Sequence, residues 1–292
     1  MSAPRTLSST LNASIPIIFV LLWSTGFIGA KMGMPHAEPF TFLAYRFMIA
    51  SAIFVLLLLV MRVPWPKDGR TWMHAAIVGS MMHGIYLGGV FFAVKNGTSG
   101  GISALIVGVQ PLLTAVFAGV LLSERLSKKT WLGFILGFVG ISLVVWHQAG
   151  DTGGWVGISS CIAGLVAVTA ATLYQKRFAT SIDLRVGSAI QFAAAAVLMW
   201  VFAISSETMV VDWTGEAIFA MAWLVLVLSI GAVTLLYILI RQGAASKVAS
   251  LFYLVPPIVA VEMYFLFGET LSMTALIGMT IAVIGVALVT KG

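Results

Sequence analysis

The sequence predicts an all-α membrane protein with ten transmembrane helices, arranged as two five-helix repeats of inverted topology. Three observations lead to this fold class. The 292 residues are 60% hydrophobic and only 9% charged, with a mean hydropathy of +1.07. The apolar residues form long continuous runs instead of the alternating ten-residue segments of a membrane barrel. The two halves of the chain also match each other at a fixed offset.

The composition excludes several classes of protein. A soluble domain is about 25% charged, well above the value found here. Cys161 is the sole cysteine, which excludes an internal disulfide and a thiolate metal site. The sequence contains no HExxH, no GxSxG and no pair of aspartates within a span, so we expect no enzyme activity, no metal and no cofactor. The net charge of +6 follows membrane topology, and we expect no nucleic-acid partner.

Each apolar run is long enough to cross a bilayer, which takes about 20 helical residues. The loops between the runs are short, so no soluble domain is inserted. The ten expected spans cover residues 12–30, 39–61, 71–94, 99–122, 129–147, 154–175, 184–205, 216–240, 245–267 and 272–290.

Basic residues predict the orientation of these spans. With the N-terminus placed in the cytoplasm, 13 of the 16 Lys and Arg residues fall on the inner side. Lys31 and Lys95 fall on the outer side, and Arg46 lies within a span. Because inner loops are enriched in Lys and Arg, we expect both termini to be cytoplasmic.

An internal repeat relates the two halves at an offset of 145 residues. Residues 98–147 align with residues 243–292 without a gap, and 12 of the 50 positions are identical. Pro111 aligns with Pro256 in this register.

Five spans in each half is an odd number, so the second copy enters the membrane from the opposite side. Inverted repeats of this kind are found in many secondary transporters, with the substrate site between the halves. We therefore expect an N-terminal repeat over residues 1–147, a C-terminal repeat over residues 148–292, and alternating access by rocking of one against the other.

Several short motifs carry a family resemblance over nearly the whole chain. They are Trp23-Ser24-Thr25-Gly26-Phe27 with Lys31, Tyr45-Arg46-Phe47, Pro111 with Glu124-Arg125-Leu126, and their repeat as Pro256, Glu269 and Leu271. With them the sequence resembles the drug/metabolite transporter superfamily, in its ten-helix EamA-type branch, and within it the YddG-like amino-acid exporters. The resemblance implies export of small metabolites or drugs across the bacterial inner membrane. It is specific to the superfamily and not to a substrate.

Arg46 and Glu262 are the charged residues deepest in the expected spans. Charges inside a membrane are costly and mark functional sites. Arg46 either binds a carboxylate or phosphate of the substrate or is a structural arginine that snorkels outward or bonds to carbonyls. Glu262 lies at a similar depth, so we expect the two to pair directly or through water. The alternative for Glu262 is a position at the lipid edge.

Polar and aromatic residues elsewhere complete the expected substrate site. His83 and Tyr86 share one helix face, and a histidine there is either a proton carrier, a substrate contact or a hydrogen-bonded core residue. Gln110 precedes Pro111, and Pro256-Pro257 stand at the matching place in the second half. Prolines break helices, and broken helices are favoured substrate sites. The other expected lining residues are Trp23, Tyr174, Gln191, Tyr237, Phe252 and Tyr253.

Glycines in spans 129–147 and 272–290 allow close helix approach. These spans form either a scaffold or a surface for self-association, and the second alternative would give a homodimer.

The expected site is aromatic and nearly neutral. It suits a small zwitterion such as a neutral or aromatic amino acid, with export as the expected function. Broad-range efflux of drugs or metabolites is one alternative, and a non-transporting sensor or scaffold is another.

Overall fold

The computed structural model describes residues 9–121, 127–148, 154–179, 182–242 and 251–291. Within these ranges the regular structure is helical, apart from one isolated antiparallel bridge between Ala37 and Val211. Six helical segments are long and apolar enough to cross a membrane, and four shorter apolar helices accompany them. The all-helical fold class expected from the sequence is confirmed for the described part of the chain.

The first half of the chain contains two long helices, one composite segment, one broken segment and a fifth helix. These are α1 (Ser9–Gly33), α2 (Pro39–Val60), the composite of α3 (Gly69–Gly79), the π-helix η1 (Ser80–Ile85) and α4 (Tyr86–Lys95), the broken pair α5 (Gly100–Val107) and α6 (Gln110–Leu121), and α7 (Lys128–Gln148).

The second half repeats this order. It contains α8 (Gly154–Phe178), α9 (Leu184–Ser206), the composite of α10 (Gly215–Ala222), the π-helix η2 (Trp223–Ala232) and α11 (Val233–Gln242), the short 3₁₀-helix η3 (Phe252–Leu254) followed by α13 (Val255–Phe267), and α14 (Met273–Lys291). The helices agree with the expected spans to within about three residues. The first part of the expected span 245–267 lies outside the described residues.

The offset of the sequence repeat is also the offset between helices. α8 begins 145 residues after α1, and α9 begins 145 residues after α2. The same shift places η1 inside η2, and the start of α6 at the start of α13. A π-helix therefore occurs at the same place in each half.

Proline explains where the fourth segment of each half is interrupted. α5 ends at Val107 and α6 begins at Gln110, next to Pro111. α13 likewise begins at Val255, with Pro256 and Pro257 in its first turn. Proline lacks the N–H that a helix interior needs but is tolerated in the first turn. The structure thus places a helix interruption next to Pro111 and a helix start at Pro256 and Pro257.

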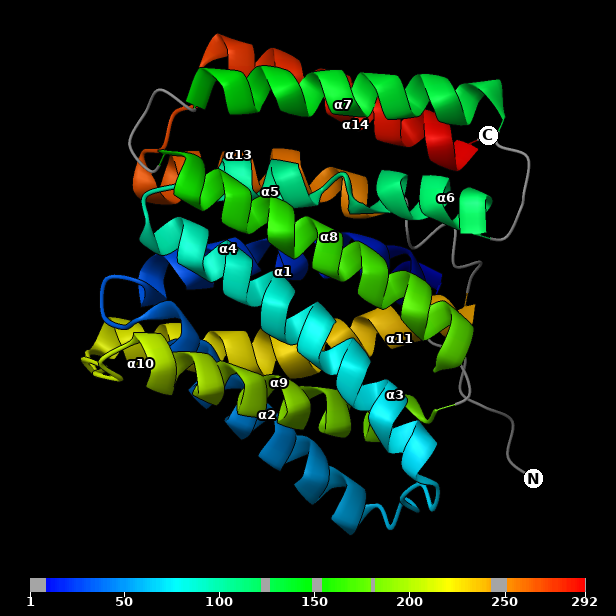
Figure 1. Ribbon diagram of the computed structural model, residues 1–292, viewed down its shortest axis with the longest axis vertical. Coiled ribbons are helices and arrows are strands. Elements are labelled where there is room, and N and C mark those ends of the chain that lie inside the picture. Colours follow the sequence, from blue (N-terminus) through cyan, green and yellow to red (C-terminus); the bar gives the residue numbers. More distant parts are fainter. Residues whose placement is uncertain (1–8, 122–126, 149–153, 180–181, 243–250, 292) are drawn as a thin grey trace.

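The helices of the two halves interleave (Figure 1). α2 lies along α9, and α7 lies along α14 at the opposite end of the molecule. α1 packs against α10, η2 and α13 of the second half, while α8 packs against α3, η1, α4 and α6 of the first half. The first helix of each half is thus embedded in the other half.

Two glycines bring α7 and α14 into close contact. A Cβ atom added to Gly140 would collide with the backbone of Gly278, and one added to Gly285 would collide with the backbone of Gly133. Each of these glycines lies 145 residues from its counterpart. The close helix approach expected for these two spans is therefore confirmed.

Candidate functional site

Arg46 lies in the middle of α2 and is 5% exposed. Its Nη2 donates a hydrogen bond to Ser229 Oγ in η2, with a long distance of 3.4 Å. Its Nε atom is buried without a hydrogen-bond partner. The guanidinium also lies 5.6 Å from the ring centre of Phe47. A buried arginine with so few partners is incompletely compensated, and such a group favours an added anion.

Gln191 occupies the corresponding place in α9, 145 residues after Arg46. The helix that carries it packs against η1, where His83 lies near Gln191. The imidazole stacks on Phe192 with ring centres 4.5 Å apart, and Phe192 stacks on Phe47 at 6.0 Å. Gly79 makes this arrangement possible, because a Cβ atom there would collide with the backbone of Gln191.

Arg46, Gln191, His83 and Ser229 thus form one polar cluster, with the rings of Phe47 and Phe192 between its two ends. Two helices and two π-helices build it, and each half supplies one of each. A π-helix widens the turn and redirects a side chain or a carbonyl, and such segments occur often at functional sites. Here Ser229 Oγ donates to Leu224 O, five residues earlier, as the wider turn allows.

Tyr86 begins α4 and borders this cluster. It lies close enough to Arg46 and to Cys161 to interact with both electrostatically. The structure therefore brings four of the expected site residues together: Arg46, His83, Tyr86 and Gln191.

The two helix breaks meet in the fold. Gly108 at the first break faces Pro256 at the second, because a Cβ atom on Gly108 would lie 2.6 Å from Pro256 Cγ. Gln110 donates from Nε2 to Thr114 Oγ1 and to Thr172 Oγ1, both at 3.0 Å. Gln110 therefore ties the broken segment of the first half to α8.

Aromatic rings of α1 and η3 form a separate group. Trp23 lies 5.2 Å from Phe252 between ring centres, in an edge-on arrangement, and Phe19 contacts both rings. Tyr174, by contrast, lies with His74: its hydroxyl is 2.8 Å from His74 Nδ1. The side chains of Tyr237 and Tyr253 lie outside the described part of the structure.

The direct pair between Arg46 and Glu262 is not formed, and that expectation is wrong. Glu262 Oε1 instead accepts a 2.7 Å hydrogen bond from Ser24 Oγ of α1, and its Oε2 is buried without a partner. Arg46 and Glu262 lie at similar depth in their spans but do not meet. The reason is that α1 packs against α13, where Ser24 of α1 binds the carboxylate of Glu262. A contact through water stays a prediction.

Bonds between the halves join the start of α2 to the loop after α9. Glu207 accepts bonds from Phe40 N, Thr41 N and Thr41 Oγ1 at 2.7–2.8 Å. Glu38 accepts from Thr208 N and Thr208 Oγ1 at 2.7 Å. We call this contact region, made by residues 36–41 with 207–216, the tied end.

Further bonds reinforce the tied end and its surroundings. His36 Nε2 lies 3.2 Å from Glu216 Oε2. Lys95 Nζ donates to Met34 O and Ala37 O, which satisfies two carbonyls in the loop between α1 and α2. Lys31 Nζ lies 2.9 Å from Glu269 Oε1. The motif residues at 124–126 that match Glu269 and its neighbours lie outside the described part.

A cleft of about 350 Å³ lies at the opposite end of α2 and α9, bordered also by η2 and α11. Its walls are mainly apolar. The lining residues are Phe54, Leu57, Leu58, Met61, Asp183, Leu184, Arg185, Ile230, Thr234 and Ile238. This site was not predicted from the sequence. Asp183 and Arg185 were the available signal, since an acid and a base flank the start of an apolar helix.

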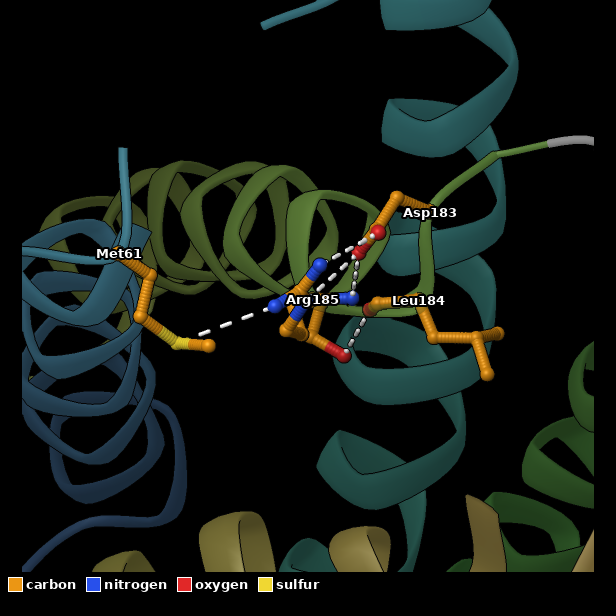
Figure 2. A network of polar contacts seen from close by, with 5 residues as sticks. Met61, Asp183, Leu184 and Arg185 are labelled. Carbon is orange, nitrogen blue, oxygen red and sulfur yellow. Dashed lines mark hydrogen bonds and ion pairs between the residues drawn. The ribbon is translucent and has the colours of Figure 1, made fainter. Parts of the chain in front are cut away.

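Asp183 and Arg185 are the charged residues of the cleft lining, and we call them its charged rim. Figure 2 shows their contacts. Asp183 Oδ1 accepts from Arg185 N and Nε, and Oδ2 accepts from Arg185 Nη2 at 2.9 Å. Hydrogen bonds from the Arg185 side chain, and secondarily from its backbone, hold the pKa of Asp183 below its usual value. The remaining guanidinium nitrogen, Nη1, lies 3.8 Å from Met61 Sδ.

Among the described residues, no group of three His, Cys, Asp or Glu side chains is arranged to hold a metal ion.

Comparisons with known proteins agree on the class of this chain. The model of the EamA-like transporter family matches it twice, at residues 13–146 and 155–291. The uncharacterized transporter YvbV of Bacillus subtilis is 24% identical, over 98% of this chain and 93% of its own length. The uncharacterized inner membrane transporter YedA of Escherichia coli K12 is 26% identical, over 93% of this chain and 88% of its own length.

A solved structure, given as "Crystal structure of protein", superposes with a TM-score of 0.68 over 95% of this chain and 96% of its own, at 22% identity. That likeness concerns the fold alone. The family matches point to a multi-pass membrane transporter and away from an enzyme. Since the family model covers both halves, the chain belongs to the EamA-like transporter family of the drug/metabolite transporter superfamily.

Proposed function

We propose that this protein exports small neutral or aromatic amino acids across the bacterial inner membrane, by alternating access between two inverted five-helix repeats. The repeats are residues 1–147 and 148–292, and both termini are cytoplasmic. Membership of a transporter family supports the general function. The common offset of the helix bounds supports the repeat, and the distribution of Lys and Arg supports the orientation.

The buried guanidinium of Arg46 is the observation that carries the substrate class. Its Nε has no partner and its bond to Ser229 is long. A substrate carboxylate would supply the missing acceptor, and guanidinium binds carboxylates through two parallel bonds. The rings of Phe47 and Phe192 beside it would receive an apolar or aromatic side chain. A carboxylate joined to an apolar group describes a neutral amino acid.

The two π-helices connect this site to alternating access. Arg46 contacts η2 of the other half, and Gln191 contacts η1 of the other half. A ligand held by Arg46 and Gln191 would therefore contact both repeats at once. Its binding energy would differ between arrangements of the halves, which is the requirement for coupling binding to a conformational change.

The test is flux of radiolabelled L-phenylalanine from proteoliposomes, comparing wild type with Arg46→Gln. We expect saturable flux in wild type and at least about a tenfold loss in the variant, the size expected when one charged hydrogen-bonding partner is removed. Phenylalaninamide, which lacks the carboxylate, should not be carried by wild type.

A stability measurement separates a substrate role from a structural one. If Arg46 binds substrate, Arg46→Gln should melt at the same temperature as wild type or higher, because it removes an incompletely compensated buried charge. Ser229→Ala is the matched control, since it removes the long bond and keeps the charge. Flux lost together with folding in Arg46→Gln would contradict the proposed role, and absence of amino-acid flux in wild type would contradict the proposed substrate.

A further inference from the structure

The cleft at the charged rim is distinct from the Arg46 cluster, and its chemistry is of a different kind. Phe54 and Leu58 are buried within its walls, while Asp183 and Arg185 have side chains 41% and 43% exposed. One border is therefore dipolar and open, and the interior is apolar. A volume of about 350 Å³ is at the lower end of the range for small-molecule sites.

We propose that this cleft is a first binding site for an apolar α-amino acid in its zwitterionic form, at the entrance used before the Arg46 cluster is reached. The proposal rests on the proposed function, because the cleft lies at the cytoplasmic end under the proposed orientation. An exporter takes up its substrate from that side.

The Asp183–Arg185 pair supplies the recognition of both charges. Arg185 Nη1 faces only a thioether sulfur among its described contacts, and thioethers are weak acceptors (Figure 2). A substrate carboxylate at this position would replace Met61 with a much stronger partner. Asp183 already accepts three hydrogen bonds from Arg185, so it would attract a substrate ammonium group mainly through its negative charge.

The adjacent positive and negative groups match the adjacent charges of an α-amino acid. The substrate ammonium would lie against Asp183 and its carboxylate against Arg185 Nη1. Its side chain would enter between α2 and α11, where Phe54, Leu58 and Ile238 line the cleft. A phospholipid is the less suitable zwitterion, because a cleft of this volume has no room for two long acyl chains.

The experiment measures equilibrium binding of radiolabelled L-phenylalanine to the full-length protein in phosphatidylglycerol nanodiscs, in the Arg46→Gln background. That background removes the proposed central carboxylate contact and leaves the cleft intact. We expect saturable binding that is reduced at least about tenfold by Asp183→Asn and by Arg185→Gln, the effect of losing one charge-assisted contact. Asparagine caps a helix as well as aspartate does, so Asp183→Asn keeps α9 capped and removes only the charge.

Two competitors and one control sharpen the result. Phenylalanine methyl ester lacks the carboxylate charge and 3-phenylpropanoate lacks the ammonium group, so each should compete at least about tenfold more weakly than L-phenylalanine. Arg70→Gln, which alters an exposed charge outside the cleft lining, should bind like its parent.

Several outcomes would overturn the proposal. One is absence of saturable binding in the Arg46→Gln background, and another is equal affinity for zwitterion and ester. Binding lost when phosphatidylethanolamine replaces phosphatidylglycerol would assign the cleft to a lipid headgroup. The variants Asp183→Asn and Arg185→Gln are also made in protein that keeps Arg46. Phenylalanine flux with an unchanged KM in both variants would reject the cleft as a substrate site and leave the proposed export intact. Binding in the cleft without any flux in wild type would support the cleft as a binding site and reject the proposed export function.

Discussion

The starts of α2 and α9 are corresponding positions in the two repeats, yet they are held in opposite ways. Glu38, the residue before α2, does not cap its own helix and instead binds Thr208 in the loop after α9. Asp183, 145 residues later, caps α9 and pairs with Arg185 two residues away. The free N–H groups at the start of α2 are satisfied from the other half by Glu207.

This difference shows that corresponding helices of the two repeats can have different contacts at their N-termini. At the tied end, carboxylates of one half bind the backbone of the other. At the opposite end, among the residues that the structure describes, Asp183 binds within its own half and a cleft stays between α2 and α11. Under the proposed orientation, the tied end faces the outside and the cleft faces the cytoplasm.

Thiol labelling should give the largest contrast between the two ends. Met61 and Ala37 flank opposite ends of α2 and are 56% and 4% exposed, while native Cys161 is fully buried. We expect Met61→Cys to react with a membrane-impermeant maleimide at least about tenfold faster than Ala37→Cys, because reaction needs an accessible thiolate. Wild-type protein is the control, because its labelling measures the reaction of native Cys161. Equal rates would contradict the comparison, and faster labelling of Ala37→Cys with added phenylalanine would show that the tied end opens.

Removal of the Glu207 carboxylate should weaken the tied end most. Glu207→Ala loses three hydrogen bonds and leaves the α2 N-terminus uncapped. We expect a loss of about 2 kcal/mol of unfolding free energy, measured by denaturant titration in detergent. Ser206→Ala is the neighbouring control, since its hydroxyl bonds within α9 to Phe202 O. Equal stability of the two variants would show that this contact does not hold the tied end.

The two corresponding carboxylates should respond unequally to neutral replacement. Glu38→Gln weakens charge-assisted bonds to Thr208 between the halves, so we expect it to cost about 1 kcal/mol of unfolding free energy. Asp183→Asn should cost less, because asparagine retains the cap of α9. Parallel melting curves at neutral pH measure both. A larger loss of unfolding free energy in Asp183→Asn would mean that the contacts of Asp183 stabilise the protein more than those of Glu38.

The pair of His36 and Glu216 should contribute least to the stability of the tied end. Its atoms are 3.2 Å apart, but the Glu216 side chain is 48% exposed, so solvent screens the interaction. We expect His36→Gln to change the unfolding free energy by less than about 0.5 kcal/mol. Added salt should leave the difference from wild type nearly constant. A loss as large as that of Glu207→Ala would mean that this pair, and not the cap, secures the tied end.

Sequence patterns predicted the helices well because hydrophobic length and proline act locally. The span ends and the helix starts at Gln110 and Val255 follow from such signals. The glycines indicated close helix approach in α7 and α14, but not that these two helices contact each other. The two π-helices were not predicted. One widened turn shifts the helical periodicity only slightly, and tertiary packing decides whether it forms.

The expected site was predicted less completely, because its contacts join distant parts of the chain. Arg46, His83 and Gln191 lie in one cluster, while Glu262 binds Ser24 and Tyr174 lies with His74. Those partners depend on which helix of one half lies against which helix of the other. Depth along a span gives the height of a residue but not its direction around the helix axis.

The interleaving of the halves has a consequence for how the protein is made. The second-half partners of α1, namely α10, η2, α11 and α13, begin at residue 215 or later, about 180 residues after α1 ends. At a synthesis rate of about 5–20 residues per second, the ribosome needs roughly 10–40 s to produce the first of them. During that time, among the described helices, α1 has only its first-half neighbours α4 and α5 to pack against. The hydroxyls of Ser24 and Thr25 can meanwhile bond to the carbonyls of Leu21 and Leu22 within α1. Assembly of the first helix is therefore a late event in the biogenesis of this transporter.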